Sequence, residues 1–191
     1  MTAVVSRSFA FLTIAADVFV IASLVVLLGA RWSATLAGVK DRWRESLGGA
    51  GLALAWTAAA VATLGSLYYS EVAHFVPCEL CWYQRIAMYP WAVVLGIAYF
   101  RADRAIARYV WPVIGIGAAI SVYHLLVERF PSLAGSACDA AAPCNILWVN
   151  EFGFVTIPFM ALSAFLLIAT ALAWAWSASH EDADARSGPR P

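Results

Sequence analysis

Apolar residues gather into five long runs that are separated by short polar or basic segments. The runs cover about residues 8–30, 49–70, 82–100, 110–127 and 153–176. Each run approaches the roughly 20 apolar residues that a helix needs to cross the hydrocarbon layer of a bilayer. The pattern predicts an all-α fold, a polytopic membrane helical bundle.

Residues 31–48, between the first two runs, show a different pattern. Apolar side chains recur there at helical spacing, while basic residues occupy the other faces. The apolar positions are Leu36, Val39, Trp43 and Leu47. This pattern predicts a short helix that lies in the membrane interface with its basic side towards lipid headgroups. A solvated loop is the alternative.

The composition agrees with a membrane protein. Apolar residues make up 63% of the 191 residues and charged residues 13%, against about 25% charged residues in soluble domains. The mean hydropathy is +0.77. A formal net charge of zero gives no reason to expect a nucleic acid as a partner. We expect one bundle, followed by a polar, disordered tail over residues 177–191.

The first run, residues 8–30, is interrupted only by Asp17. A signal peptide would also place a basic residue such as Arg7 before an apolar stretch, but that stretch is usually about 7–15 residues long. We therefore expect a retained helix. A carboxylate within a span is by default a functional-site candidate, and Asp17 is expected to bond a neighbouring helix or to face a small polar cavity.

Positive charge predicts the orientation of the bundle, because Lys and Arg are retained on the cytoplasmic side. Five spans place residues 31–48, residues 101–109 and the tail on one side, and this side holds nine of the twelve Lys and Arg residues. The other three are Arg7, Arg85 and Arg129. We expect the first set in the cytoplasm, and the N-terminus and both cysteine loops outside it.

The four cysteines form two closely spaced pairs. Cys78 and Cys81 form a C-x-x-C pair where a polar loop enters the third run, and Arg85 follows four residues later. A thiolate in the first turn of a helix is stabilised by unpaired N–H groups and the helix dipole, and Cys81, one turn from Arg85, is the best-placed candidate. Cys138 and Cys144 lie in the loop after the fourth run. Two pairs on one side of a membrane fit an electron relay.

Other readings of the cysteines stay open. Outside the cytosol thiols can persist as disulfides, so two inert disulfides would make the chain a non-catalytic, disulfide-stapled scaffold or partner subunit. A metal site of four cysteines is a second alternative, although zinc sites commonly have tighter spacings than C-x5-C. A small transporter with Asp17 as its proton site is disfavoured, because the five runs show no paired inverted repeat.

The residues around both pairs resemble the DsbB family of membrane proteins, which reoxidise thioredoxin-like disulfide donors. The first loop carries the family's C-x-x-C-x-x-x-R signature as CELCWYQR at residues 78–85. The second part follows the family's order through Tyr123-His124, Phe130-Pro131, Cys138, Cys144, Trp148 and Glu151-Phe152-Gly153. The short Cys138 to Cys144 spacing is closer to BdbC-type members. The resemblance covers about residues 49–176 and implies a four-helix core, so the extra helix and interfacial segment in residues 1–48 depart from the pattern.

The resemblance implies a route for electrons through catalytic cysteines. A reduced thioredoxin-fold partner that resembles DsbA would attack Cys138 and release Cys144 as a thiolate. Cys144 would then exchange with Cys78, and Cys81 would be the thiolate that faces a quinone. The implied resting pairs are Cys78 with Cys81 and Cys138 with Cys144. The implied activity is that of a protein-dithiol:quinone oxidoreductase in a bacterial inner membrane.

The resemblance also implies residues that bind the quinone, either ubiquinone or menaquinone. Arg85 would hold a quinone oxygen, with a snorkelling arginine as the alternative, and His124 would bond the quinone or pass a proton, with a packing histidine as the alternative. We expect neither metal nor flavin, since no glycine-rich nucleotide fingerprint or histidine-rich ligand set appears. A vitamin-K-epoxide-reductase-like enzyme is disfavoured, because its quinone-side C-x-x-C comes late in the chain.

Overall fold

The computed structural model of the chain describes residues 2–135, 138 and 142–187, with side chains up to residue 178. Its long helices are α1 (Thr2–Gly29), α2 (Ala34–Leu67), α3 (Glu79–Phe100), α4 (Ala107–Arg129) and α5 (Ile157–Ser187). Within this described part, no strand accompanies the helices, and a single antiparallel bridge joins Glu151 to Val155. The predicted all-α bundle is therefore confirmed.

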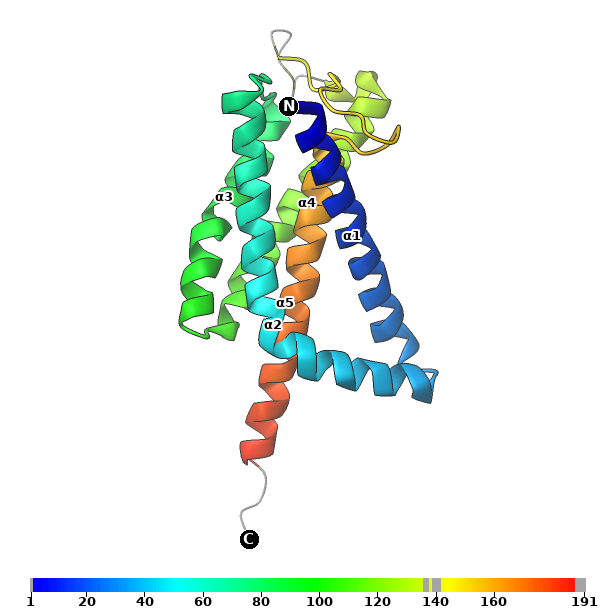
Figure 1. Cartoon of the computed structure of the whole chain (residues 1–191), viewed down its shortest axis with the longest axis vertical. Helices are drawn as coiled ribbons and strands as arrows, with labels where there is room; N and C mark the ends of the chain where they lie inside the picture. The colour runs from blue at the N-terminus through cyan, green and yellow to red at the C-terminus, as the bar shows by residue number, and fades with distance from the viewer. Residues whose placement is uncertain (1, 136–137, 139–141, 188–191) are drawn as a thin grey trace.

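Four helical segments are long and apolar enough to cross a membrane, judged by length and composition over the described residues. They are Thr2–Gly29, Ala34–Val72, Arg104–Arg129 and Ile157–Ala178. Helix α3 runs along the same bundle (Figure 1), but its first turns hold Gln84 and Arg85 and lower its apolar content. The multi-pass membrane protein expected from the sequence is thus supported, and the crossing by α3 stays a prediction.

The predicted interfacial segment and second span form one bent helix, α2. Its first part lies crosswise at one end of the bundle and its second part runs along the bundle (Figure 1). Trp43, in the crosswise part, stacks on Phe19 of α1 with 6.1 Å between ring centroids. It also packs edge-on against Trp174 of α5, with 6.0 Å between ring centroids. These aromatic contacts hold the crosswise part between α1 and α5. Short π-helix η1 (Tyr68–Val72) continues α2 at the other end.

The last helix is longer than the sequence analysis predicts. Residues 177–191 were expected to be a disordered tail, but α5 continues to Ser187. That expectation is wrong for residues 177–187, because they contain helix-forming Ala, Glu and Arg and hold no Gly or Pro before Gly188 and Pro189. Residues 188–191 lie outside the described part.

The core lies between α2, α3, α4 and α5 and is filled by large apolar side chains. Leu95, Ile114, Phe165 and Leu172 are almost fully buried there. Small residues allow the helices to approach one another closely, as is common in membrane bundles. A Cβ on Gly51 of α2 would lie 2.5 Å from the carbonyl oxygen of Ala171 on α5, so the two backbones are in direct contact.

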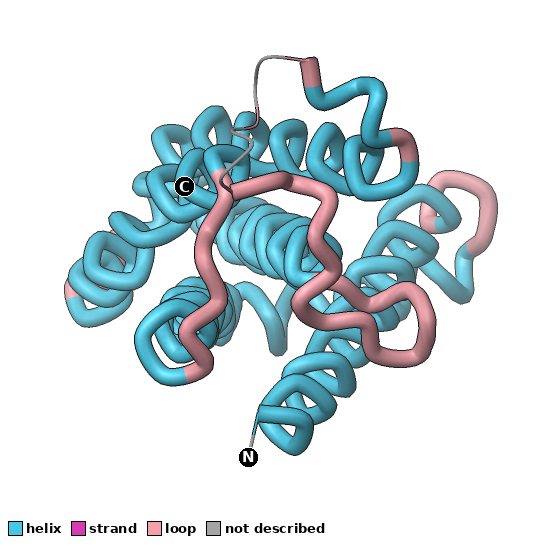
Figure 2. Tube along the Cα trace, turned by 90° about the horizontal axis from the view of Figure 1, so that it is seen from above, coloured by secondary structure: helices cyan, strands magenta, loops and turns pink. Residues whose placement is uncertain are grey.

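Both cysteine loops lie at the same end of the bundle as the N-terminus. The loop between η1 and α3 and the loop between α4 and α5 cover that end, and the C-terminus lies at the opposite end (Figures 1 and 2). The crosswise part of α2 and the connection between α3 and α4 also lie at the opposite end (Figure 1). This grouping is the one that five spans require, whereas the side of the membrane on which each end lies stays a prediction.

Replacing Gly51 with alanine should destabilise the protein by about 1–3 kcal/mol, because a backbone oxygen cannot move away from the added methyl group. Gly49→Ala in the same helix is the matched control, since nothing lies within 4 Å of its added Cβ and alanine favours a helix by up to ~1 kcal/mol. The unfolding midpoint in detergent should fall for the first variant and hold or rise for the second. Equal midpoints would contradict the close packing of α2 on α5.

Candidate active site

Cys78 occupies the N-cap of α3. The chain reaches it in an extended conformation, with φ −74° and ψ 173°, and its sulfur accepts a hydrogen bond from the backbone N–H of Cys81 at 3.3 Å. An N-cap side chain meets the N–H groups that have no partner within the helix. The C-x-x-C spacing therefore puts Cys78 at the cap and Cys81 in the first turn.

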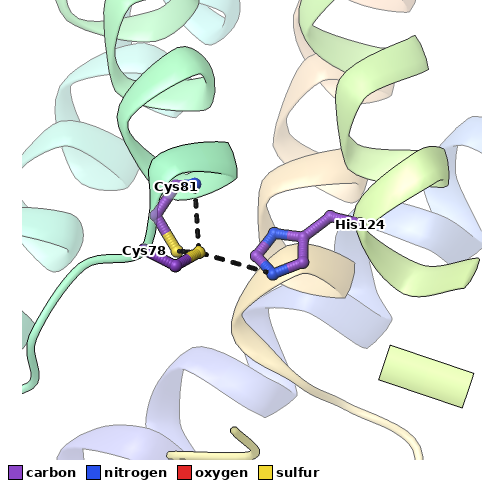
Figure 3. Close-up of side chains that lie close together, drawn as sticks. All are labelled: Cys78, Cys81 and His124. Carbon is purple, nitrogen blue, oxygen red and sulfur yellow. Dashed lines mark hydrogen bonds between the residues drawn. The ribbon is translucent and has the colours of Figure 1, made fainter. Parts of the chain in front are cut away.

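The two sulfurs of this pair are in contact. Cys78 Sγ lies 2.8 Å from Cys81 Sγ, and both residues are free cysteines in this structure (Figure 3). Cys78 is buried and Cys81 is half-buried. The resemblance implied a disulfide between these two cysteines, whereas this structure holds them as a closely placed dithiol.

His124 of α4 connects the first pair to the second. Its Nε2 atom lies 3.6 Å from Cys78 Sγ (Figure 3). The same atom lies 3.0 Å from the carbonyl oxygen of Cys144. The ring is 2% exposed. An Nε2–H tautomer donates to both groups, which holds the ring between the two cysteine loops.

The second pair is a disulfide between Cys138 and Cys144, with a Cα to Cα distance of 5.8 Å. Cys144 is buried in one apolar cluster with Cys78, Leu80 and Val127, and Cys138 is partly buried at the edge of that cluster. All four cysteines therefore meet at one end of the bundle, and Cys138 is the more accessible half of its disulfide.

The environment of Cys78 lowers the pKa of its thiol to about 4. The largest cause is the hydrogen bond from the Cys81 thiol, and His124 and the backbone N–H of Cys81 act in the same direction against the effect of burial. The sequence analysis assigned the stabilised thiolate to Cys81. The structure corrects this assignment, because the N-cap residue receives the helix N–H and His124 lies on the same side.

A cavity of about 300 Å³ lies on the other side of Cys81. Its walls are mostly apolar, and a few polar groups converge on one part of it. The polar lining residues include Ser66, Gln84, Arg85 and Tyr89. A mostly apolar cavity with a few convergent polar groups is typical of a small-molecule site.

Arg85 is held at the wall of this cavity by α2. Its Nε and Nη2 groups donate to the hydroxyl and carbonyl oxygens of Ser66, both at 3.1 Å, and its guanidinium carbon lies 5.2 Å from the centre of the Trp82 ring. Tyr89 also donates to the Ser66 hydroxyl, at 3.0 Å. Since a guanidinium has five N–H donors, these contacts orient Arg85 without using all of its hydrogen-bonding capacity.

A second, much smaller cavity of about 20 Å³ lies among the sulfurs. Its walls include Cys78, His124 and Cys144, and Cys81 lines both this cavity and the large one. His124 does not line the large cavity. The structure therefore brings Cys81 and Arg85 to the large cavity but places His124, which was expected beside a quinone, between the two cysteine pairs.

Three of the expected residues have donor atoms close enough together to hold a metal ion. Donor atoms of Cys78, Cys81 and His124 all lie within 4.8 Å of one another. The four-cysteine metal site considered from the sequence is not formed in this structure, because Cys138 and Cys144 are joined in a disulfide.

Sequence reasoning missed several residues at the cavity. Ser66, which orients Arg85, is separated from it by 19 positions and belongs to another helix, so no local pattern identifies it.

An aromatic stack also closes the cavity at the loop end. Phe75 lies 5.6 Å from Tyr69 and 4.9 Å from Trp148, ring centre to ring centre, and all three rings line the cavity. Only Trp148 was considered from the sequence.

Comparison with known families gives a match over most of the chain. The model of the family described as "Disulfide bond formation protein DsbB" matches residues 49–177. The matched segment contains all four cysteines, Arg85 and His124, and it leaves out α1 and the crosswise part of α2.

Individual relatives agree with this match. The chain is 52% identical over 114 residues to disulfide bond formation protein C of Bacillus subtilis, which covers 59% of this chain and 83% of that protein. It is 49% identical over 119 residues to a probable disulfide formation protein of Oceanobacillus iheyensis, and this match covers 61% of this chain and 82% of that protein. A probable disulfide formation protein of Coxiella burnetii is 42% identical over 119 residues, which cover 61% of this chain and 81% of that protein. No solved structure matches the chain significantly.

The lowered pKa of Cys78 predicts a pH dependence that can be followed by the ultraviolet absorbance of its thiolate. In a variant with Cys138 and Cys144 replaced by alanine, Cys81→Ser leaves Cys78 as the one thiol and retains a hydroxyl donor, whereas Cys81→Ala removes the donor. Cys81→Ala should therefore titrate at least about one pH unit higher than Cys81→Ser.

The lowered pKa of Cys78 also determines how the stability of the reduced protein changes with pH. The thiolate stabilises the reduced protein at pH values above the ordinary thiol pKa of about 8.5, and this contribution is lost as the pH falls through the lowered value. Coincident titration curves for the serine and alanine variants would contradict a hydrogen bond from position 81 as the main cause.

Proposed function

Since this chain belongs to the DsbB family of disulfide bond formation proteins, we propose that it is a membrane thiol:quinone oxidoreductase. It takes two electrons from a dithiol of a DsbA-like, thioredoxin-fold partner and passes them through both cysteine pairs to a membrane quinone. The partner leaves with a new disulfide, and the quinone leaves as a quinol.

One observation carries this proposal. Cys81 lines both the small cavity that holds Cys78 and Cys144 and the large cavity that holds Arg85. A sulfur between these two spaces has access to thiol–disulfide exchange on one side and to a small-molecule acceptor on the other. An inert disulfide staple would need neither the large cavity nor an arginine oriented at its wall.

The first exchange takes place at the second loop. A thiolate of the partner attacks Cys138, the more accessible sulfur, so that a mixed disulfide forms and Cys144 leaves as a thiolate. The partner's second thiolate then attacks the mixed disulfide, which releases Cys138 as a thiolate and the partner as a disulfide. The second loop has gained two electrons in these steps.

The second exchange moves these electrons to the first loop. With Cys78 and Cys81 joined in a disulfide, the Cys144 thiolate attacks Cys78, and Cys81 leaves as a thiolate. Cys138 then attacks Cys144, which restores the Cys138 to Cys144 disulfide and releases Cys78. The resulting Cys78 thiolate is stabilised by the cap of α3 and by His124, as the lowered pKa of Cys78 indicates.

The large cavity fits a quinone headgroup in both size and chemistry. Ligand cavities begin at about 300 Å³, and this one offers the cationic Arg85 on an otherwise mostly apolar wall. A bound quinone supplies an acceptor for two electrons and two protons. Arg85, oriented by Ser66, donates a hydrogen bond to an oxygen atom placed in the cavity and stabilises negative charge on that atom.

His124 has a different role from the one that the family resemblance implied. It contacts Cys78 and Cys144, so it stabilises thiolates during exchange between the loops and does not bind the quinone. We assign the cysteine end of the bundle to the extracytoplasmic side of a bacterial inner membrane, where the partner meets Cys138. The basic segments at the other end then face the cytoplasm, as the distribution of Lys and Arg favours.

Replacing Cys81 with serine should abolish quinone reduction, because the Cys78 to Cys81 disulfide can no longer form. Cys138→Ser should abolish it as well, but at an earlier step. The measurement is quinone absorbance after a reduced thioredoxin-like dithiol is added to the purified protein in detergent, with oxidation of that dithiol followed in parallel.

The two serine variants are controls for each other. Cys81→Ser keeps the Cys138 to Cys144 disulfide and should still oxidise the dithiol in a single turnover, whereas Cys138→Ser should not. Normal turnover by Cys81→Ser would contradict the proposed function. A wild-type protein that is folded but reduces neither ubiquinone nor menaquinone analogues would favour the disulfide-stapled scaffold.

Replacing Arg85 with glutamine should weaken quinone use, raising the apparent KM for the quinone by about 10-fold or more, since a charge-assisted hydrogen bond contributes about 1.5–3 kcal/mol. Arg129→Gln is the matched control, because Arg129 is exposed and does not line the large cavity. An unchanged KM for Arg85→Gln would indicate that Arg85 is only a snorkelling side chain.

A further inference from the structure

Helix α1 lies outside the segment that the family model matches, yet it forms part of the wall of the large cavity. The cavity-lining residues of α1 are Phe9, Leu12, Thr13 and Ala16. They recur every three or four positions, which places them on one face of the helix. The rest of the wall comes from α2, α3 and α5 and from the cysteine loops.

We infer that α1 is a fifth wall of the quinone site, and that its cavity face controls how the quinone enters and is held. This inference rests on the proposed function and deepens it. The ligand is a quinone with an apolar tail, and the residues concerned are Leu12, Thr13 and Ala16, none of which the family match includes.

Exposure distinguishes the mouth of the cavity from its interior. Leu12 lines the cavity although its side chain is 56% exposed, whereas Thr13 also lines it and is 7% exposed. A residue that is both cavity-lining and largely exposed lies at an opening. Because the outer surface of α1 is apolar, with Val18 and Ile21 about 60% exposed, this opening faces the lipid from which a quinone would enter.

Helix α1 is fixed to the core along its length, so it is a wall and not a loosely attached helix. The Phe9 ring fills the space beside Gly65 of α2, where an added Cβ would lie 2.8 Å from the ring. The Tyr69 hydroxyl donates to Ser6 at 3.2 Å, and Trp174 of α5 donates to Ser23 at 3.2 Å.

Asp17 adds a polar contact next to the cavity. Its carboxyl group lies close to Ser163 of α5, which lines the cavity and whose hydroxyl donates to the carbonyl oxygen of Phe159 at 3.0 Å. Asp17 is therefore placed beside a neighbouring helix, and the hydrogen bond expected for it stays a prediction. The neighbouring Ala16 lines the cavity with a small side chain, so this part of α1 leaves room for a ligand at Ala16.

The outer end of α1 also contacts the loop that completes the cavity. Arg7 forms an ion pair with Glu151 at 3.5 Å, and Phe11 packs edge-on against Phe152 with 5.4 Å between ring centroids. This loop carries Trp148, which closes the cavity over Phe75. Helix α1 thus supports both a side and the loop end of the quinone site.

The test compares two neighbouring alanines that differ in the face of α1 they occupy. Ala16 lines the cavity, whereas Ala15 is exposed and does not line it. Ala16→Trp places an indole in the cavity and should raise the apparent KM for the quinone by about 10-fold or more, the scale of misfit in a hydrophobic pocket. Ala15→Trp should leave this KM within about twofold.

A binding measurement separates the inference from the proposed function. Wild-type protein is irradiated with a photoreactive azidoquinone, and the labelled peptides are identified by mass spectrometry. Label should appear on residues 2–29 in the wild type and with Ala15→Trp, and should be lost with Ala16→Trp. Single-turnover oxidation of the dithiol without quinone should be the same in all three proteins.

The outcomes are distinguishable. If the wild type reduces quinone but the two tryptophan variants have equal KM values for the quinone, α1 is not a wall of the site and the inference is overturned. The same holds if the azidoquinone labels α3 but never labels α1. If the wild type neither reduces nor binds quinone, the proposed function itself fails. Loss of dithiol oxidation in Ala16→Trp would indicate misfolding, and labelling of α1 in the wild type then decides.

Discussion

The start of α3 is the constraint on which the site depends. A helix leaves unpaired N–H groups in its first turn, and here Cys78 accepts one of them while Cys81 lies three positions further on. This geometry directs the two sulfurs to different neighbours although they are 2.8 Å apart. Cys78 meets His124 and the buried Cys144, and Cys81 borders the large cavity. The different surroundings of Cys78 and Cys81 thus follow from the N-cap of α3.

The remainder of the bundle positions groups around that cap. Helix α4 brings His124 between the two cysteine loops, α2 supplies Ser66 to orient Arg85, and the aromatic stack closes the cavity at the loop end. Close packing of the helices makes these positions rigid, since small residues such as Gly51 let backbones meet. Helix α1 encloses the cavity from a side that the family match does not include.

The sequence predicts the helices well because long apolar runs leave few alternatives in a membrane. The C-x-x-C pair and Arg85 were also found from local spacing. The end of α5 was misjudged because polar composition was taken as disorder, although residues 177–187 favour a helix. Local spacing also gave the stabilised thiolate to Cys81, and the family resemblance gave His124 a place beside the quinone. Both assignments depend on which side of α3 faces which neighbour, and a linear pattern does not contain that information.

The central claim is that the four cysteines form one relay that ends at Cys81. The most direct test mixes the fully oxidised protein rapidly with a reduced thioredoxin-like dithiol in the absence of quinone, stops exchange with acid, and maps disulfides by mass spectrometry. The account predicts that a Cys78 to Cys144 disulfide appears transiently as the Cys78 to Cys81 disulfide is lost, and that the Cys138 to Cys144 disulfide then re-forms. A protein that loses only its Cys138 to Cys144 disulfide, with the first pair still oxidised, would contradict it.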